Sequence, residues 1–561
     1  MTAPERLALG AVIAAGFALR IAGLQDIGFS PDEAQFIYIA ASDSWDSAWH
    51  SIVKRSPHPP ANFALLHALL KLSWDPLWLR LPSVLAGTFL VWLAHRFGRS
   101  LFGPVAGFAF AVLVAFSPAL LELSRVCRNY APGFAFLLPA IHCLVRHVET
   151  RSRRPLAVFA VLAPLAGIWH YGFVVVFVAL DTVVAIEFLL QRRPLRDWLA
   201  VAVAHLPFVL TLGALYRFHI SQMPDRLVGM HQTTYASSLG LSMLDSLAPF
   251  QQVWRYLELD PFAAILGVLS LAGAVGLLLR RRRLAFLVCV LPPAVALGFS
   301  AFGLIPFGGT RHSAYLFPFL FGPVAFAIGE LAAGFRAAPG DAARASGASR
   351  EIAVWGAATA VLLGLWFAGT TCADRLTEKR YAPLTPDGMR NELPVWYRVA
   401  DVEAGFALLE REVGENDLVL LEFQGLYALR MHHHLTPPAK KRSRLSGLSR
   451  RVRTFELNGV AYHYSHEARV LTPEVLLRLA DRVIGARRLA EPQRIWAVQG
   501  SWEFPLAEQM RRRFPRVPFD ESVERESGGT VFAIDSADLR AALPGPRAAA
   551  REPGRRGRPE R

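Results

Sequence analysis

The sequence predicts a mainly α-helical, polytopic membrane protein with about eleven transmembrane helices, followed by a small α/β domain. Hydrophobic residues make up 53% of the 561 residues, and the mean hydropathy is +0.31, which is more apolar than a soluble domain requires. The apolar residues form runs of about 17–22 residues, the length that crosses a bilayer core of about 30 Å. After residue 371 the apolar segments shorten to the length of β-strands.

The predicted spans follow one another through the first part of the chain. The apolar stretch from 155 to 190 is too long for one span, and we divide it at the polar turn His170-Tyr171-Gly172. The first run resembles a signal peptide but continues to Leu24 without a small-residue cleavage site, so we expect a retained span. The runs centre near residues 7–24, 82–97, 101–120, 131–147, 155–169, 172–190, 197–216, 261–279, 284–304, 313–335 and 352–370.

The chain has a formal net charge of +15, and its basic residues fall into clusters between the apolar runs instead of forming a stripe for nucleic acid. Every second connection carries such a cluster, which is the positive-inside pattern. We therefore expect a cytoplasmic N-terminus, with the loop that contains Asp32 and the region after residue 371 on the outer face. The clusters are Arg96 with Arg99; Arg146, Arg151, Arg153 and Arg154; Arg192, Arg193 and Arg196; Arg280 to Arg283; and Arg336, Arg344 and Arg350.

The outer loop 25–80 contains two further helical stretches, Ser42–Arg55 and Pro60–Leu72. The second is apolar but too short to span a bilayer, which favours a helix lying along the membrane interface. The expected regions are a membrane domain over residues 1–371, an extracytoplasmic α/β domain over residues 372–540, and a disordered basic tail over residues 541–561.

The predicted α/β domain alternates short apolar segments with helical patterns. No Gly-rich dinucleotide fingerprint and no Walker-type phosphate loop is present in the sequence, which argues against an enzyme that uses nucleotide sugars in the cytosol. The expected strands are Asp417–Phe423, Phe455–Tyr464, Arg494–Gly500 and Gly528–Ile534, and the expected helices are Ala400–Val413, Thr472–Ile484 and Glu503–Phe514.

The stretch after the first span is the strongest candidate for chemistry. Ser30 can cap a helix, Pro31 suits its first position, and Glu33 lies three residues after the cap. Asp32 and Glu33 then lie in the first helical turn, where the macrodipole favours negative charge. One interpretation is a stabilised helix start; the other is a catalytic or metal-binding pair of carboxylates at the membrane face.

Arginines on the same predicted side supply the opposite charge. Arg125 and Arg128 are three residues apart, so on a helix they would share a face and bind a phosphate together. The alternative is a pair of arginines that reach lipid headgroups. Arg311, at the start of a later span, either adds positive charge to the same cavity or anchors the membrane interface.

Further candidates lie at the outer ends of spans. His58 precedes two prolines that fix the chain, and it either faces the site or is a turn residue without chemical function. His170 and Tyr171 either contact substrate or form a satisfied polar pair. The stretch Met431-His432-His433-His434 has the residues of a metal site but no evident carboxylate partner. The four cysteines, Cys127, Cys143, Cys289 and Cys372, show neither zinc spacing nor a disulfide framework.

An ordered set of motifs over the first 135 residues resembles the bacterial branch of the GT-C glycosyltransferases, which includes protein O-mannosyltransferase-like enzymes and the lipid A aminoarabinose and galacturonic acid transferases. Weaker likenesses follow at Trp169-His170-Tyr171 and at Thr310 to Leu316. The motifs are Pro31-Asp32-Glu33-Ala34, His58-Pro59-Pro60, Leu79-Arg80-Leu81-Pro82-Ser83-Val84-Leu85-Ala86-Gly87, Arg99-Ser100-Leu101-Phe102-Gly103, Ser117-Pro118, Ser124-Arg125 and Arg128-Asn129-Tyr130.

The resemblance implies a GT-C fold in the bacterial cytoplasmic membrane, a polyprenyl-phosphate sugar as donor, and transfer on the outer face to a glycolipid such as lipid A, a polysaccharide or a protein hydroxyl. It implies catalysis by Asp32, beside which Glu33 is a second candidate acid. A lipid phosphate as leaving group needs cations, for which Arg125 and Arg128 are the candidates and Arg311 a weaker one. The candidates for substrate contacts are His58, Tyr130, His170 and Tyr171. A carboxylate at a helix start has a low pKa, so orientation of the acceptor or binding of a divalent metal is an open part of its role. No ligands for a metal can be assigned.

Two other classes of function remain open from the sequence. A transporter or lipid flippase would carry ionisable residues in the middle of several spans and two related halves; the charges lie mainly at span ends, apart from Asp181 and Glu187. A sensor or assembly scaffold would depend entirely on the region after about residue 390.

Overall fold

The computed structural model describes residues 2–25, 29–224, 248–258, 262–336, 399–421, 453–457, 460–464, 473–487 and 492–498, with short segments between 517 and 541. The predicted span 352–370, the histidines around His433 and the helix Glu503–Phe514 lie outside these residues. By internal contacts the chain forms two compact units, Met1–Gln25 with Ile39–Leu393, and Asp26–Tyr38 with Pro394–Arg561. The domain limits expected from composition stay predictions.

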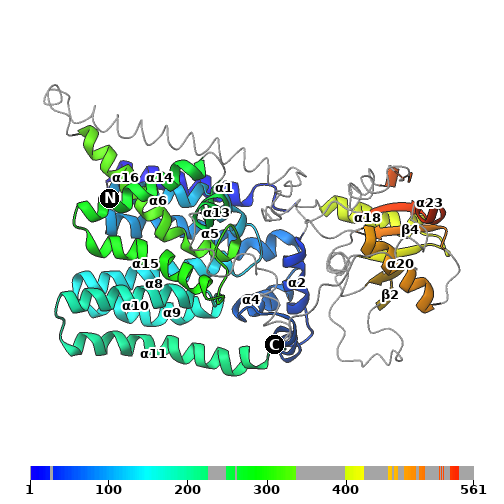
Figure 1. Ribbon diagram of the computed structural model, residues 1–561, viewed down its shortest axis with the longest axis horizontal. Helices are drawn as coiled ribbons and strands as arrows, with labels where there is room; N and C mark the ends of the chain where they lie inside the picture. The colour runs from blue at the N-terminus through cyan, green and yellow to red at the C-terminus, as the bar shows by residue number, and fades with distance from the viewer. Residues whose placement is uncertain are drawn as a thin grey trace, which may run out of the picture. The chain divides into compact units, whose positions relative to one another are not determined.

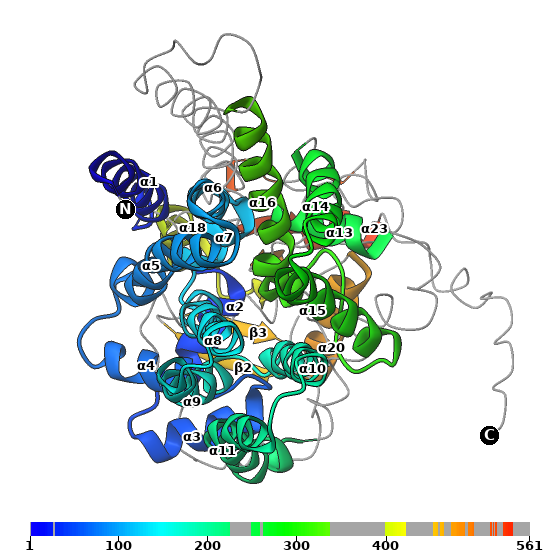
Figure 2. The ribbon, with the colours of Figure 1, turned by 90° about the vertical axis from the view of Figure 1, so that its left-hand side faces the viewer.

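The first unit is a bundle of long helices, which run side by side in Figure 1 and are seen end-on in Figure 2. Two short helices, α3 (Trp45–Arg55) and α4 (Ala61–Leu70), confirm the helical stretches of the first loop. The other helices of this unit are α1 (Ala3–Ile21), α5 (Pro76–Phe102), α6 (Pro104–Phe116), α7 (Pro118–Ser124), α8 (Tyr130–Thr150), α9 (Arg153–Trp169), α10 (Phe173–Leu190), α11 (Leu195–Phe218), η1 (Ile220–Gln222), α13 (Ala248–Leu257), α14 (Phe262–Leu279), α15 (Arg283–Ala301), η4 (Arg311–Leu316) and α16 (Phe317–Arg336).

The chain is a multi-pass membrane protein. Seven of the described helices are long and apolar enough to cross a bilayer, and α6 with α7 would make an eighth. Helix α1 carries Glu5, Arg6 and Arg20, and α9 has 17 residues, so neither is among the seven. Each predicted run before residue 336 coincides with described helices, while the total of about eleven spans stays a prediction.

The predicted run 101–120 is not one straight span. It forms α6 and α7, which are bent by 60° at Ser117. Pro118 lacks an amide hydrogen and forces the residue before it out of the helical region, which explains the break. The Ser117 hydroxyl donates to the carbonyl of Leu257 at 2.8 Å, so the bend is tied to the end of α13.

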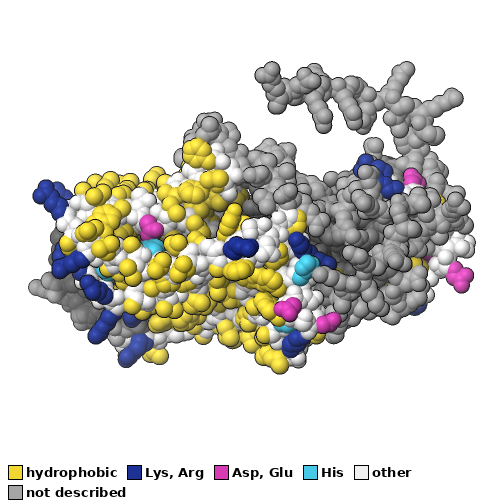
Figure 3. Space-filling model, turned by 90° about the horizontal axis from the view of Figure 1, so that it is seen from below, with side chains coloured by type: hydrophobic (Ala, Val, Ile, Leu, Met, Phe, Trp, Pro, Cys, Tyr) yellow, Lys and Arg dark blue, Asp and Glu magenta, His cyan; other side chains and the backbone are white. Residues whose placement is uncertain are grey.

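The described basic clusters lie at one end of the bundle, as predicted. Arg283 bonds Glu187 at 2.7 Å, Arg282 donates to the Leu101 carbonyl, and Arg99 pairs with Glu5 near the N-terminus. These contacts join the α14–α15, α10–α11 and α5–α6 turns to the start of α1. Figure 3 shows dark blue basic side chains gathered at the left-hand end of this unit, next to a broad hydrophobic side surface. We call this the basic end.

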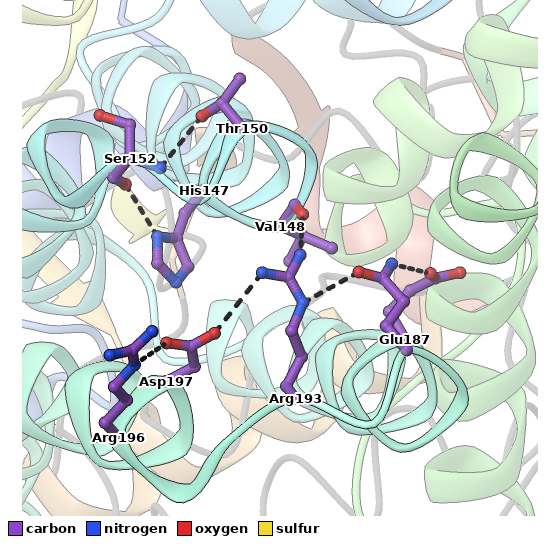
Figure 4. A network of polar contacts seen from close by, with 9 residues as sticks. His147, Val148, Thr150, Ser152, Glu187, Arg193, Arg196 and Asp197 are labelled. Carbon is purple, nitrogen blue, oxygen red and sulfur yellow. Dashed lines mark hydrogen bonds and ion pairs between the residues drawn. The ribbon is translucent and has the colours of Figure 1, made fainter.

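Figure 4 shows a polar network at the basic end that joins α8, α10 and α11. Arg193 donates to the carbonyl of Val148 at 2.9 Å and lies 3.5 Å from Asp197. Gln191 connects Arg193 to Glu187 through bonds of 2.9 and 2.8 Å. Glu187 therefore has structural partners, and Asp181 lies 2.9 Å from His205 on α11. The transporter alternative relied on Asp181 and Glu187 as ionisable residues within spans. Their contacts with Gln191, Arg283 and His205 give both acids a structural role instead.

The second unit contains a mixed sheet with strand order β2-β3-β1-β4-β5. Strands β3, β1 and β4 are parallel, and the two outer pairs are antiparallel. The core includes Trp496, which is fully buried and donates to Asp417 at 2.8 Å. The elements are α2 (Pro31–Ala40), which ends in the first unit, α18 (Val399–Glu412), β1 (Leu418–Leu421), β2 (Arg453–Leu457), β3 (Val460–Tyr464), α20 (Pro473–Arg487), β4 (Arg494–Val498), β5 (Val531–Asp535) and α23 (Ser536–Ala541).

The single strand expected over Phe455–Tyr464 is wrong, because this segment belongs to two antiparallel strands, β2 and β3. Leu457 pairs with Val460, on either side of Asn458-Gly459. Asn-Gly is the dipeptide most typical of a two-residue hairpin, so the sequence carried the signal.

Close packing of α14 against α16 predicts a large effect of Gly273→Ala. A Cβ at Gly273 would lie 2.5 Å from the carbonyl carbon of Pro323 and 3.0 Å from its Cα, and backbone cannot rotate away. We expect a loss of about 1–3 kcal/mol, measured as a lower thermal unfolding midpoint in detergent. Gly267→Ala on the same helix is the control, since its nearest neighbour is Trp254 at 3.5 Å. Equal midpoints for the two variants would contradict this packing.

Candidate functional site

The helix start at Asp32 has the predicted capping box. The Glu33 carboxylate accepts from the Ser30 amide at 3.0 Å and from its hydroxyl at 3.1 Å, while the Glu33 amide donates to Ser30 Oγ at 3.3 Å. Glu33 is fully buried, whereas Asp32 is partly exposed. Glu33 therefore fixes the start of α2, and Asp32 is the more accessible of the two predicted catalytic acids.

Basic side chains gather at the end of the first unit opposite the basic end. His58, between α3 and α4, has Nε2 3.4 Å from Nη2 of Arg128. Burial lowers the pKa of His58 well below its usual value, and the next contributions to this lowering come from Arg128, His312, His170 and Arg311. We call these five residues the basic cluster.

The basic cluster is placed by the ends of helices. Helix α8 has 21 residues and is therefore about 30 Å long; it ends at the basic end, so its start beside Arg128 lies across the membrane from it. Arg128 and His312 are buried, while His58, His170 and Arg311 are partly exposed. The cluster is therefore reachable from outside the protein core.

Hydrogen bonds hold the segment before α8 in place. Asn62 of α4 donates to the carbonyl of Cys127 at 3.1 Å, and Ser83 of α5 donates to that of Arg128 at 3.4 Å. Asn129 donates to the carbonyl of Trp169 at 2.8 Å. These bonds connect α4, α5, α8 and α9 around Arg128, although the segments are far apart in the sequence.

Tyr130 adjoins two members of the basic cluster, while Tyr171 contacts a histidine after α11. The rings of Tyr130 and His170 have centroids 5.5 Å apart, and the Arg128 guanidinium lies 6.0 Å from the Tyr130 ring centroid. The hydroxyl of Tyr171 bonds Nδ1 of His219 at 2.6 Å, and burial raises the pKa of Tyr171. Tyr130 thus adjoins both His170 and Arg128, and Tyr171 contacts the end of α11.

The expectation that Arg125 and Arg128 share a helix face is wrong. Residues 125–129 form bends between α7 and α8, so the helical spacing does not apply. Arg125 is buried and donates to the carbonyls of Leu19 and Arg20 at 2.7 and 3.2 Å. Burial, then the charge of Arg80, lowers the pKa of Arg125 to about 10, which leaves it charged at neutral pH. Arg125 therefore caps the C-terminal end of α1.

Two further buried arginines, Arg20 and Arg80, belong to the same capping system, and neither was among the predicted site residues. Arg20 donates to the carbonyls of Gly16, Ala115 and Val114 at 2.8 to 3.1 Å. Arg80 donates to the carbonyl of Leu24 at 3.0 Å. A charged residue inside an apolar run was the available signal.

No group of three or more metal-ligating side chains occurs in the described part of the chain. The histidines around His433 fall outside it, so the predicted alternatives for a metal stay open.

The comparisons with known proteins agree with the helical architecture. A family model described as dolichyl-phosphate-mannose-protein mannosyltransferase matches residues 57–218, which includes His58, Arg128 and His170. No curated protein sequence matches this chain.

Among solved structures, ArnT from Cupriavidus metallidurans bound to undecaprenyl phosphate is similar with a TM-score of 0.50, at 11% identity over 96% of this chain and 99% of that chain. The apo state of ArnT gives 0.48 at 11% identity, over 94% and 98% of the two chains. The oligosaccharyltransferase AglB from Archaeoglobus fulgidus, in complex with an inhibitory peptide and a dolichol-phosphate, gives 0.45 at 11% identity, over 96% and 72%. The first match shows a shared fold, the one that the GT-C resemblance implied.

The capping role of Arg125 predicts that Arg125→Gln lowers stability. Loss of two buried, charge-assisted hydrogen bonds to α1 should reduce the free energy of unfolding by about 2 kcal/mol. Thermal unfolding of the purified protein in detergent measures this. Arg154→Gln, at an exposed position, is the control. If both variants unfold at the wild-type temperature, Arg125 does not have this role.

Proposed function

We propose that this chain is an integral-membrane glycosyltransferase. It transfers a sugar from a polyprenyl-phosphate-linked donor to an acceptor on the outer face of the bacterial cytoplasmic membrane. The acceptor is lipid A or another glycolipid, a polysaccharide, or a protein hydroxyl. The observation that carries the proposal is the basic cluster, with Arg128 buried beside His58 at one end of a membrane bundle.

The basic cluster suits a lipid phosphate as leaving group. When the bond between the sugar and the phosphate breaks, negative charge develops on the phosphate oxygen, and fixed cations stabilise that charge. Guanidinium groups donate to phosphate oxygens in pairs, which assigns this role to Arg128 with Arg311. Tyr130, which adjoins Arg128, and His170, which adjoins Tyr130, are proposed to contact the bound substrate. Arg125 is proposed to act on the phosphate only by positioning the bend that leads to Arg128.

Asp32 is proposed as the catalytic carboxylate that accepts or orients the proton of the acceptor hydroxyl. Its position in the first turn of α2 favours the charged form. Glu33 supports it by closing the capping box with Ser30. A divalent metal that assists Asp32 belongs to the same proposal. Loss of sugar transfer when a chelator removes the metal would support this part of the proposal, and unchanged transfer would contradict it.

The comparisons support a lipid-phosphate donor. The matched family model is named for a dolichyl-phosphate-mannose donor, and ArnT was solved with undecaprenyl phosphate. The positions of the basic clusters support a cytoplasmic basic end, with the site end on the opposite face.

Transfer is tested with membranes that contain the protein and a panel of radiolabelled polyprenyl-phosphate sugars, followed by identification of the labelled acceptor. We expect one donor to label an acceptor, and Asp32→Asn to reduce the rate by at least about 100-fold, since a positioned acid–base group contributes about that much. Asp46→Asn, at an exposed position of α3, is the control. Full transfer by Asp32→Asn would refute its catalytic role, and labelling by no donor would refute the function.

The proposed orientation is tested by cysteine labelling of intact cells. Lys71 and Arg154 are both exposed, the first after α4 near the site end and the second at the basic end. We expect a membrane-impermeant thiol reagent to label Lys71→Cys in spheroplasts and Arg154→Cys only after permeabilisation. The reverse pattern would place the site end in the cytoplasm.

A further inference from the structure

We propose that His58 is a specificity-determining residue that takes up a proton when the phosphomonoester product occupies the basic cluster, so that product is held tightly at low pH and released as the pH rises. The inference rests on the proposed function, and it names the charge state of the ligand that this site distinguishes.

The geometry of the pair fixes the charge of His58 before a ligand binds. Its Nε2 faces Nη2 of Arg128 at 3.4 Å. A guanidinium nitrogen carries only donors, so Nε2 is oriented as an acceptor and the imidazole is neutral. A ring protonated on both nitrogens would direct N–H against N–H at this contact. The contact in this structure therefore fits a neutral His58.

The charges that lower the pKa of His58 come from three other segments. Arg128 belongs to the bend before α8, His170 to the end of α9, and Arg311 and His312 to η4. On its own segment, the backbone amide of His58 donates to Ser56 Oγ at 3.1 Å. Burial and these positive groups lower the pKa of His58. An anion bound in the cluster places a negative charge next to His58. This charge favours the protonated imidazole and therefore raises the pKa of His58.

The reaction creates such an anion. The donor is a phosphodiester with one negative charge. Transfer breaks the bond between the sugar anomeric carbon and the phosphate oxygen, and that oxygen keeps the electron pair. The anomeric carbon bonds to the acceptor oxygen, whose hydroxyl proton is released. The product is a phosphomonoester with a second negative charge and a second pKa of about 6. The acceptor's proton leaves by way of Asp32 to the solvent. As the second negative charge is gained beside His58, the imidazole takes up one proton from the solvent.

The pH dependence follows from this proton. His58 is neutral in the free site and protonated beside the dianionic product, so binding takes up one proton above the second pKa of the free phosphate. Affinity for the monoester should then fall about tenfold per pH unit above about pH 7 until the bound His58 itself deprotonates. A phosphodiester has one charge throughout this range, so its affinity should change little.

The test uses the purified full-length protein in lipid nanodiscs, with a polyprenyl phosphate and its methyl phosphodiester as probes. Isothermal titration between about pH 6.5 and 8.5, in buffers with different ionisation enthalpies, gives affinity and proton uptake. We expect uptake of one proton near pH 7.5 for the monoester, no uptake for the diester, and a difference in affinity that shrinks about tenfold per pH unit. His58→Gln should abolish the uptake and the pH dependence.

His50→Gln, an exposed histidine of α3, is the matched control and should retain wild-type uptake. Equal pH slopes for monoester and diester in the wild-type protein would overturn the inference without any variant. A His58→Gln protein that binds the monoester with the wild-type slope would overturn it as well. If neither probe binds at any pH, the proposed function fails together with this inference, whereas pH-independent binding of both leaves the function standing.

Discussion

The architecture of the site end depends on the need of buried guanidinium groups for acceptors. Charge at membrane depth is costly unless it is paired or hydrogen-bonded. Arg20 and Arg125 find their acceptors among the carbonyls at the ends of α1 and α6, which a helix leaves unsatisfied. Each of these hydrogen bonds thus satisfies both a buried guanidinium group and a carbonyl at the end of a helix. The ends of α1, α6 and α7 are thereby fixed relative to one another.

The basic side chains have different surroundings at the two ends of the bundle. At the basic end, acids compensate several of them, as Arg283 is by Glu187 and Arg280 by Glu330. Such pairs close the turns between helices and need no ligand. At the site end, the charges that lower the pKa of His58 are those of Arg128, His312, His170 and Arg311. A cluster of this kind gains stabilisation when an anion enters, which is the property that binding and leaving-group stabilisation both require.

The features predicted from the sequence depend on local or periodic patterns. Apolar runs gave the helices, the spacing of Ser30 and Glu33 gave the capping box, and the alternation of basic clusters gave a common end. The features that were missed depend on contacts between distant segments. The pairing of Arg20 with Ala115 leaves no local trace. The separation of Arg125 from Arg128 follows from bends whose hydrogen-bond partners lie on other helices. Two local signals were overlooked: the Asn-Gly dipeptide between the paired residues Leu457 and Val460, and the charge of Arg20 inside an apolar run.

The irregular segment 125–129 explains why the site lies where it does. Buried backbone outside helices and strands needs hydrogen-bond partners for its polar groups. Here Asn62 and Ser83 donate to its carbonyls from two other helices, and every residue of the segment is buried. Because the backbone is released from a helix, neighbouring arginines point to different places: Arg125 to the end of α1, and Arg128 to His58. A continuous helix from α7 to α8 would give both side chains the same direction, and the basic cluster would lose the contact between Arg128 and His58.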